Sequence, residues 1–202
     1  MIKIDYEDIV TSTYMADAII RDDFPGFKED YLVVHCLLKK YKPNRLVEIG
    51  TSTGVGTNII CNAVGLSRFL FWKNKGIKVY SIDVPPGTDQ SILYPDAEDG
   101  HPERAGAKCK YPYVQLYGNS VDFDFSPYYP IDAWFIDGKH NYEYAMKDTA
   151  QALLSGPFLL MWHDVQIEEV GKAVIDVMDG KKEFELFRVG DTRVAFAIKR
   201  TK

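Results

Sequence analysis

The sequence contains few cysteines, and they form no recognised motif. Cys36, Cys61 and Cys109 are odd in number and include no C-x-x-C pair, which argues against a zinc knuckle and against a disulfide framework. We expect Cys36 and Cys61, which lie among apolar residues at helical spacing, to pack in the core. Such sparing use of cysteine is typical of a reducing compartment, so we expect a cytoplasmic protein.

Long apolar runs and an excess of positive charge are also missing. No stretch approaches the ~20 apolar residues of a membrane span, and the segment from Met1 to Asp8 has no apolar signal core. The formal net charge is −5 at pH 7, whereas proteins that bind phosphate backbones present a basic face. We therefore expect neither a membrane nor a nucleic-acid partner.

The composition that is present belongs to one globular domain. Of the 202 residues, 46% are hydrophobic and 26% are charged, as expected for a folded chain with a full core. Residues 1–202 are therefore predicted to form a single domain.

Two segments of that domain fall outside its regular pattern. Residues 1–42, the N-terminal extension, are predicted to be helical with a turn at 22–26, and to form a cover on the sheet, a lid, or a surface that pairs two copies. The oligomeric state is thus left open, with a homo-oligomer as one alternative. Residues 84–110, the insertion, form a connection long enough to suggest function, with disorder as the competing explanation. Its His101 is either a substrate contact or a solvated histidine.

Strand and helix patterns alternate through the rest of the chain. A short apolar strand ends at Gly50 and is followed by Val55, Ile59, Ala63 and Leu66, which have helical spacing. Further strands are predicted at 77–83, 114–117, 131–136 and 158–162, helices at 142–153 and 170–177, and a hairpin at 183–187 and 193–198. This order predicts an α/β fold: a three-layer αβα Rossmann-like sandwich with a mostly parallel seven-stranded sheet and a C-terminal antiparallel hairpin.

Polar residues recur where the predicted parallel strands end, namely Glu48, Asp83, Asp137, His163 and Asp164, with His140 in the loop after one of these strands. Because the carboxyl ends of parallel strands share one edge of a sheet, these side chains are expected to converge on a crevice. Crowded acids repel one another unless something positive binds beside them. The pattern therefore predicts a site for a divalent cation or a cationic cofactor.

The strand, glycine turn and helix at residues 46–66 predict a binding point for a nucleotide or an anionic cofactor tail. Such a turn directs backbone N–H groups and the positive end of a helix at one place. Asp83, at the tip of the next strand, is of the type that accepts hydrogen bonds from both ribose hydroxyls. The alternative is that Asp83 only caps the turn at 85–87.

Several motifs together resemble the class I S-adenosylmethionine-dependent O-methyltransferases, and most of all the branch related to catechol O-methyltransferase and the macrolide-sugar O-methyltransferases. The motifs are Glu48-Ile49-Gly50-Thr51-Ser52-Thr53-Gly54, the acid at Asp83, Ile136-Asp137-Gly138-Lys139-His140-x-Tyr142, and Trp162-His163-Asp164. The resemblance covers about residues 30–200.

This resemblance implies S-adenosyl-L-methionine as the cofactor and assigns residues to it. The methionine end would lie against Gly50, Thr51, Ser52 and Gly54. Asp83 would hold the ribose, and Asn119 and Ser120 would contact the adenine. Glu48 and Asp137 complete the expected cofactor-binding set. Ser52 departs from the family pattern, since it replaces the middle glycine of the first motif.

The resemblance also implies a divalent metal, with Mg²⁺ as the family's metal, at Asp137, His163 and Asp164. His163 stands where metal-dependent members often have an acid. Mg²⁺ prefers oxygen ligands, whereas imidazole suits softer metals. This departure leaves open which metal is used and whether one is used.

The leading functional hypothesis is methyl transfer from S-adenosylmethionine to a hydroxyl of a small molecule. His140 is the candidate base that takes the hydroxyl proton, and Asp137 is the second candidate catalytic residue; alternatively His140 only caps the following helix. A related cephalosporin-hydroxylase-like enzyme and a non-catalytic S-adenosylmethionine-binding domain are the alternatives. A set of aromatic residues could line the acceptor pocket or merely fill the core: Tyr94, Tyr111, Tyr113, Tyr128, Tyr129 and Trp134.

Overall fold

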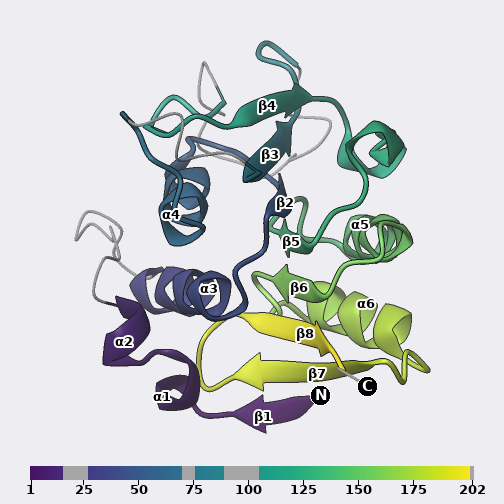
Figure 1. The fold of residues 1–202 in the computed structure, drawn as a ribbon. Coiled ribbons are helices and arrows are strands. Elements are labelled where there is room, and N and C mark those ends of the chain that lie inside the picture. The colour runs from purple at the N-terminus through teal and green to yellow at the C-terminus, as the bar shows by residue number, and fades with distance from the viewer. Residues whose placement is uncertain (16–26, 70–75, 89–104, 201–202) are drawn as a thin grey trace.

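The computed structural model describes residues 1–15, 27–69, 76–88 and 105–200, which form one sheet covered by helices on both faces (Figure 1). The sheet has eight strands in the order β1-β7-β8-β6-β5-β2-β3-β4. Their bounds are β1 (Ile2–Ile4), β2 (Arg45–Ile49), β3 (Lys78–Asp83), β4 (Val114–Tyr117), β5 (Ala133–Ile136), β6 (Leu159–Trp162), β7 (Phe184–Val189) and β8 (Ala195–Lys199). Among these strands only β8 is antiparallel to its neighbours, which confirms the predicted mostly parallel sheet with a terminal hairpin.

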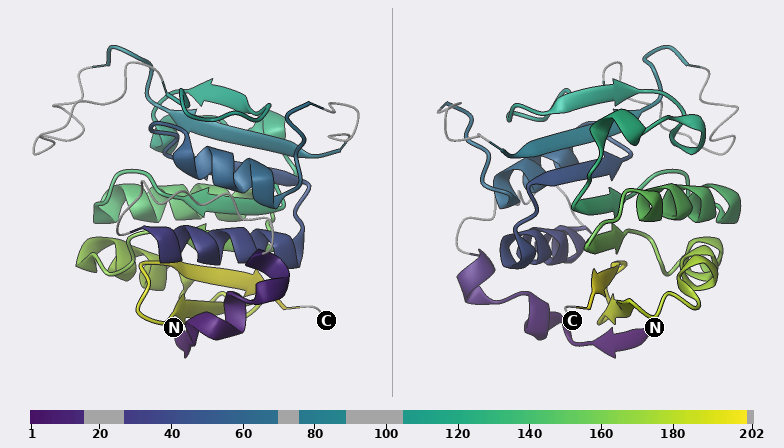
Figure 2. Two further views of the ribbon diagram at one scale, coloured as in Figure 1. Left: turned by 90° about the vertical axis from the view of Figure 1, so that its left-hand side faces the viewer. Right: turned by 45° about the vertical axis from the view of Figure 1, so that its right-hand side comes forward.

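Helices α3 (Lys28–Tyr41) and α4 (Val55–Ala63) cover one face of the sheet, and α5 (Tyr142–Leu154) and α6 (Glu168–Met178) cover the other (Figure 1). Two short helices, α1 (Tyr6–Ile9) and α2 (Ser12–Met15), lie beside α3 near the β1 edge (Figure 2). Short 3₁₀ helices span Ser120–Asp122 and Ser126–Tyr128. Among the described residues, none of the helices has the length and apolarity to cross a membrane.

The apolar strands build two cores because successive side chains point to opposite faces. Phe135 and Met161 belong to the core under α3 and α4. Their neighbours Trp134 and Trp162 belong to the core under α5 and α6. All four side chains are fully buried, so these strands need apolar residues on both faces, as buried parallel strands do.

The first strand corrects the prediction that the whole N-terminal extension is helical and that the sheet has seven strands. Ile2–Ile4 pairs in parallel with β7, so β1 is an eighth strand at the edge of the sheet. Three residues cannot form a helix with a buried face, but their backbone N–H and C=O groups can pair with the open edge of β7. The predicted turn at 22–26, with most of the insertion (89–104, including His101), lies outside the described residues.

The chain changes direction at β2, and this positions the site. From β2 it proceeds outward through α4, β3 and β4, and it then returns to β5 on the other side of β2. In open α/β sheets, ligands bind beyond the carboxyl ends of the strands where the order reverses in this way. Gly50 and Asp137 come directly after β2 and β5 and therefore lie at that point.

Candidate functional site

A cavity of about 320 Å³ opens at the carboxyl ends of the strands, a volume within the range of small-molecule sites. It is lined by Phe27, Tyr31, Gly50, Thr51, Ser52, Thr53, Val55, Gly56, Asp83, Asp137, Gly138, His140, His163 and Asp164. A smaller adjoining cavity of about 40 Å³ is lined in part by Asn119 and Ser120 and shares Gly50, Asp83 and Gly138 with the first. The structure thus brings together ten predicted site residues from five separate segments. Of the predicted set, Glu48 and Gly54 do not line either of these two cavities.

The loop after β2 can approach β5 so closely because Gly50 has no side chain. Its φ is +95°, and a Cβ there would lie 2.0 Å from the backbone oxygen of Asp137. Ser52 also has a positive φ, of 46°, and its backbone N–H donates to Asp83 Oδ2 at 2.6 Å. Asp83 therefore connects the tip of β3 to the loop while facing both cavities.

The amino end of α4 is directed at the same cavity. Val55 and Gly56 of its first turn line the cavity, and Gly54 at its N-cap provides no side-chain cap. Backbone N–H groups at such an end favour an anionic partner. Gly54 instead supports the loop from outside, because a Cβ there would lie 2.6 Å from the Cα of Gly106. The segment at Gly106 is attached to the same loop, since its N–H donates to the carbonyl of Ser52 at 2.9 Å.

Glu48 lies beneath the loop rather than in the cavity, and only 1% of it is exposed. Its Oε2 accepts hydrogen bonds from Thr57 Oγ1 and Ser81 Oγ, both at 2.5 Å. Burial raises the pKa of Glu48 to about 8, although these two hydrogen bonds oppose the shift. The geometry gives Glu48 a supporting position between β2, β3 and α4.

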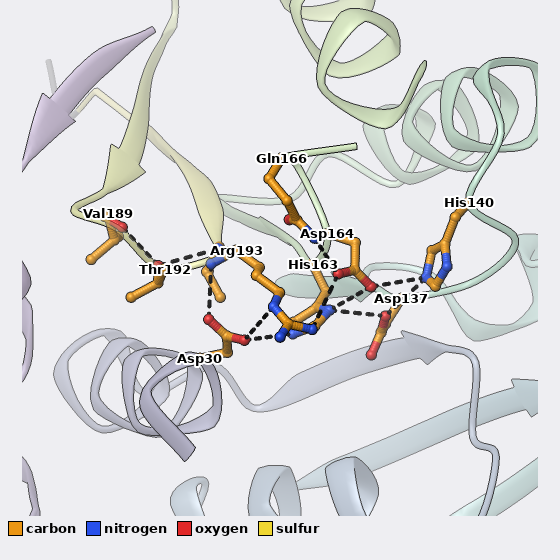
Figure 3. Close-up of polar contacts among 10 residues, drawn as sticks. Asp30, Asp137, His140, His163, Asp164, Gln166, Val189, Thr192 and Arg193 are labelled. Carbon is orange, nitrogen blue, oxygen red and sulfur yellow. Dashed lines mark hydrogen bonds and ion pairs between the residues drawn. The ribbon is translucent and has the colours of Figure 1, made fainter. Parts of the chain in front are cut away.

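Carboxylates and imidazoles meet on the other side of the cavity (Figure 3). His163 Nδ1 is 2.9 Å from Asp164 Oδ2 and 3.4 Å from Asp137 Oδ1. His140 Nε2 is 3.1 Å from the same Asp164 oxygen and 3.6 Å from Asp137 Oδ1. Asp164 has a left-handed backbone, with φ of 55°, a conformation that is uncommon in non-glycine residues but that Asp adopts more readily than most.

The charged groups of this cluster shift one another's pKa values. Burial would lower the pKa of His163, but the neighbouring acids raise it to about 10. Burial would raise the pKa of Asp164, yet the neighbouring imidazole of His163 lowers it to about 2. The hydrogen bond to Asp137 raises the pKa of His140 above its ordinary 6.5. The two acids thus stabilise positive charge beside them, as expected of a cation site.

One ligand atom from each of Asp137, His163 and Asp164 can be chosen so that all lie within 4.8 Å of one another. His163 is only 3% exposed, and its Nδ1 makes no hydrogen bond of good geometry within the described part of the chain. A buried nitrogen that faces two carboxylates without a proper hydrogen bond fits a metal ligand. The donor set of one nitrogen and two carboxylates is compatible with a divalent cation.

Sequence reasoning missed the residues that α3 and the terminal hairpin contribute. Tyr31 lines the cavity, and Asp30 contacts the far side of His163. Asp30 is an acid among the apolar residues of a helix, and this feature of the sequence could have identified it. Tyr94, one of the aromatic residues considered for the acceptor pocket, lies outside the described residues. The others do not line the main cavity. Trp134 is in the core, where its Nε1 donates to Ser155 Oγ.

Comparisons with known proteins place the fold. No protein-family model and no curated protein sequence matches the chain. The solved structure of the O-methyltransferase from Bacillus cereus in complex with SAH matches with a TM-score of 0.59 and 16% identity, over 96% of this chain and 90% of that one. The O-methyltransferase TomG from Streptomyces achromogenes, in complex with SAM and involved in tomaymycin synthesis, matches with a TM-score of 0.59 and 16% identity, over 100% of this chain and 92% of that one.

An SAH-bound methyltransferase from Podospora anserina matches with a TM-score of 0.57 and 11% identity, over 97% of this chain and 86% of that one. At such low identities these likenesses establish the architecture. The chain has the fold of class I S-adenosylmethionine-dependent O-methyltransferases, and at that level the resemblance seen in the sequence is confirmed.

Proposed function

We propose that this protein is an S-adenosylmethionine-dependent methyltransferase that transfers a methyl group to a hydroxyl of a small molecule, with a divalent metal in the site. One observation carries the proposal. A single cavity, in a methyltransferase fold, is lined by the glycine loop (residues 50–53, after β2), by Asp83 and by the carboxylate–imidazole cluster, which consists of Asp137, His140, His163 and Asp164. A nucleoside site and a candidate base and metal site are thereby adjacent.

The cofactor would span both cavities. Asp83 lies at their junction and would accept hydrogen bonds from the ribose hydroxyls. The glycine loop and the amino end of α4 would hold the methionine carboxylate. Asn119 and Ser120 line the smaller cavity and would contact the adenine. The sulfonium would then point into the larger cavity, toward the carboxylate–imidazole cluster.

Methyl transfer is an in-line displacement. The acceptor oxygen forms a bond to the methyl carbon, the carbon–sulfur bond breaks, and the electron pair remains on sulfur as a thioether. His140 Nε2 would take the hydroxyl proton, and Asp137 and Asp164 on either side would stabilise the resulting imidazolium. A divalent metal held by Asp137, His163 and Asp164 would lower the pKa of the acceptor hydroxyl and would orient the acceptor.

The test has two stages. Calorimetric titration of the protein with S-adenosylmethionine, and with NAD as the comparison, should show binding of S-adenosylmethionine alone. Transfer of a labelled methyl group to a panel of catechols and sugar hydroxyls should then occur and should fall after treatment with a chelator. Failure to bind S-adenosylmethionine would refute the proposal, and binding without transfer to any acceptor would favour the non-catalytic alternative.

A matched variant tests the role of the cluster. Asp137→Ala should abolish turnover while S-adenosylmethionine still binds, because the base and the metal lose their shared carboxylate but the glycine loop and Asp83 remain. Full activity in this variant would exclude the metal site. The cytoplasmic location and the oligomeric state stay predictions, for fractionation and light scattering to test.

A further inference from the structure

Asp30, on α3, contacts the candidate metal centre from behind. It is 3% exposed, and its Oδ2 lies 3.3 Å from His163 Nε2. Its Oδ1 accepts a hydrogen bond from the backbone N–H of Arg193 at 2.8 Å, and the Arg193 Nε is 3.7 Å from Oδ2. Asp30 is therefore fixed in place and has a cation beside it (Figure 3).

The imidazole of His163 is held with its two nitrogens facing different groups. Phe27 and Tyr31 stack near its ring, with centroids 5.8 Å and 6.0 Å away. Nε2 faces Asp30, and Nδ1 faces the carboxylates of Asp137 and Asp164. Rotation of the ring would break the contact with Asp30 and remove Nδ1 from the cavity.

Carboxylates face both nitrogens, so the position of the proton depends on what lies between Nδ1 and the carboxylates of Asp137 and Asp164. A cation bound there would displace a proton from Nδ1, and Asp30, which can only accept, would retain the proton on Nε2 and leave the lone pair of Nδ1 directed at the cavity. Histidines that bind metals commonly donate their other N–H to a carboxylate in this way. The charge also balances, because Arg193 offsets Asp30 and a divalent cation would offset Asp137 and Asp164.

We propose that Asp30 is a positioning residue that presents His163 Nδ1 as a metal ligand, and that the resulting centre selects a divalent transition metal over Mg²⁺. The inference rests on the metal-assisted form of the proposed function. Its physical basis is the ligand set: Mg²⁺ demands oxygen ligands and gives up water reluctantly, whereas an imidazole ligand favours metals such as Fe²⁺, Co²⁺ and Zn²⁺.

Two variants of the full chain separate this proposal from a merely structural role. Asp30→Asn keeps an oxygen for the Arg193 N–H but turns an amide N–H toward Nε2, which favours the tautomer with the proton on Nδ1 and blocks the ligand lone pair. His163→Asp converts the centre to oxygen ligands only. Asp176→Asn is the control, because Asp176 is an exposed carboxylate paired with Lys172 on α6.

Metal affinity and ligand identity are the readouts, measured on chelator-treated protein by calorimetry with Co²⁺ and Mg²⁺, and by pulsed electron paramagnetic resonance with Mn²⁺. The wild type should prefer Co²⁺, and Mn²⁺ bound to it should show nitrogen modulation from an imidazole. Asp30→Asn should weaken Co²⁺ binding by about 10- to 100-fold, and His163→Asp should lose the nitrogen modulation and shift the preference toward Mg²⁺. The control should match the wild type.

Unchanged Co²⁺ affinity in Asp30→Asn, or nitrogen modulation that survives in His163→Asp, would overturn the proposal; the second result would assign the nitrogen to His140. S-adenosylmethionine binding is measured on the same samples. A wild type that binds S-adenosylmethionine but shows no preference for Co²⁺ over Mg²⁺ would refute only this inference, whereas a wild type that does not bind S-adenosylmethionine would refute the proposed function.

Discussion

Glu48 should make the stability of this protein fall as the pH rises. Burial raises its pKa from 4.5 to about 8 in the folded state, whereas the unfolded chain ionises at the ordinary value. Between these two pKa values the folded state holds a proton that the unfolded state has lost, so the free energy of unfolding decreases with increasing pH. The full shift corresponds to about 5 kcal/mol, lost by the time the pH exceeds the folded pKa.

Glu48→Gln isolates this contribution. Glutamine has nearly the same shape, and its amide oxygen can still accept the hydrogen bonds from Thr57 and Ser81, but it does not ionise. The variant and the wild type should therefore have similar stability only at about pH 4.5 and below, where Glu48 is protonated in the unfolded chain as well. Above about pH 8 the variant should be more stable, by up to about 5 kcal/mol.

The assay is urea unfolding of both proteins from about pH 6 to about pH 9, with the difference between their unfolding free energies as the measured quantity. Glu143→Gln is the control: Glu143 is exposed and paired with Lys147, so its substitution should give a difference that changes little with pH. A Glu48→Gln difference that stays constant over this range would refute the reasoning from burial.

Three further substitutions test the site. Asp83→Ala removes the acceptor of the Ser52 N–H as well as the proposed ribose contact, and calorimetry should show at least several-fold weaker S-adenosylmethionine binding; an unchanged affinity would remove Asp83 from the site. In the wild type, the rate should rise as the pH passes through the raised pKa of His140. His140→Gln should lower kcat and abolish this acid limb of the pH–rate profile. An acid limb that persists would assign the base to another residue. Gly50→Ala places a Cβ against the Asp137 backbone. Thermal unfolding should show that the free energy of unfolding falls by about 1–3 kcal/mol or more.

Most of the fold could be predicted from the sequence because its strands are short apolar runs separated by glycine, proline and helical spacing. Strands such as β6 are buried on both faces and so show a continuous apolar pattern. β1 could not be predicted, because three residues carry no periodicity and become a strand only when the edge of β7 is available to pair with them.

The site was predicted where it depends on strand tips and was missed where it depends on packing between distant elements. Asp83, Asp137 and Asp164 follow from the topology of a parallel sheet, whereas Asp30 reaches His163 only because α3 packs over β6. Glu48 was expected to contact the cofactor. Its side chain instead faces α4, on the same side of β2 as Leu46, since alternate residues of a strand share a face.

The contact between Gly54 and Gly106 has a consequence for the history of the chain. Neither position tolerates a side chain on its own account, since a Cβ at Gly106 would also collide with the hydroxyl of Tyr113. A Cβ at Gly54 would strike the backbone of Gly106 itself, which lies about fifty residues away in the sequence. Among descendants of a common ancestor, each of the two glycines should therefore be retained, and a chain that carries a bulky residue at either of them should have rebuilt the loop after β2.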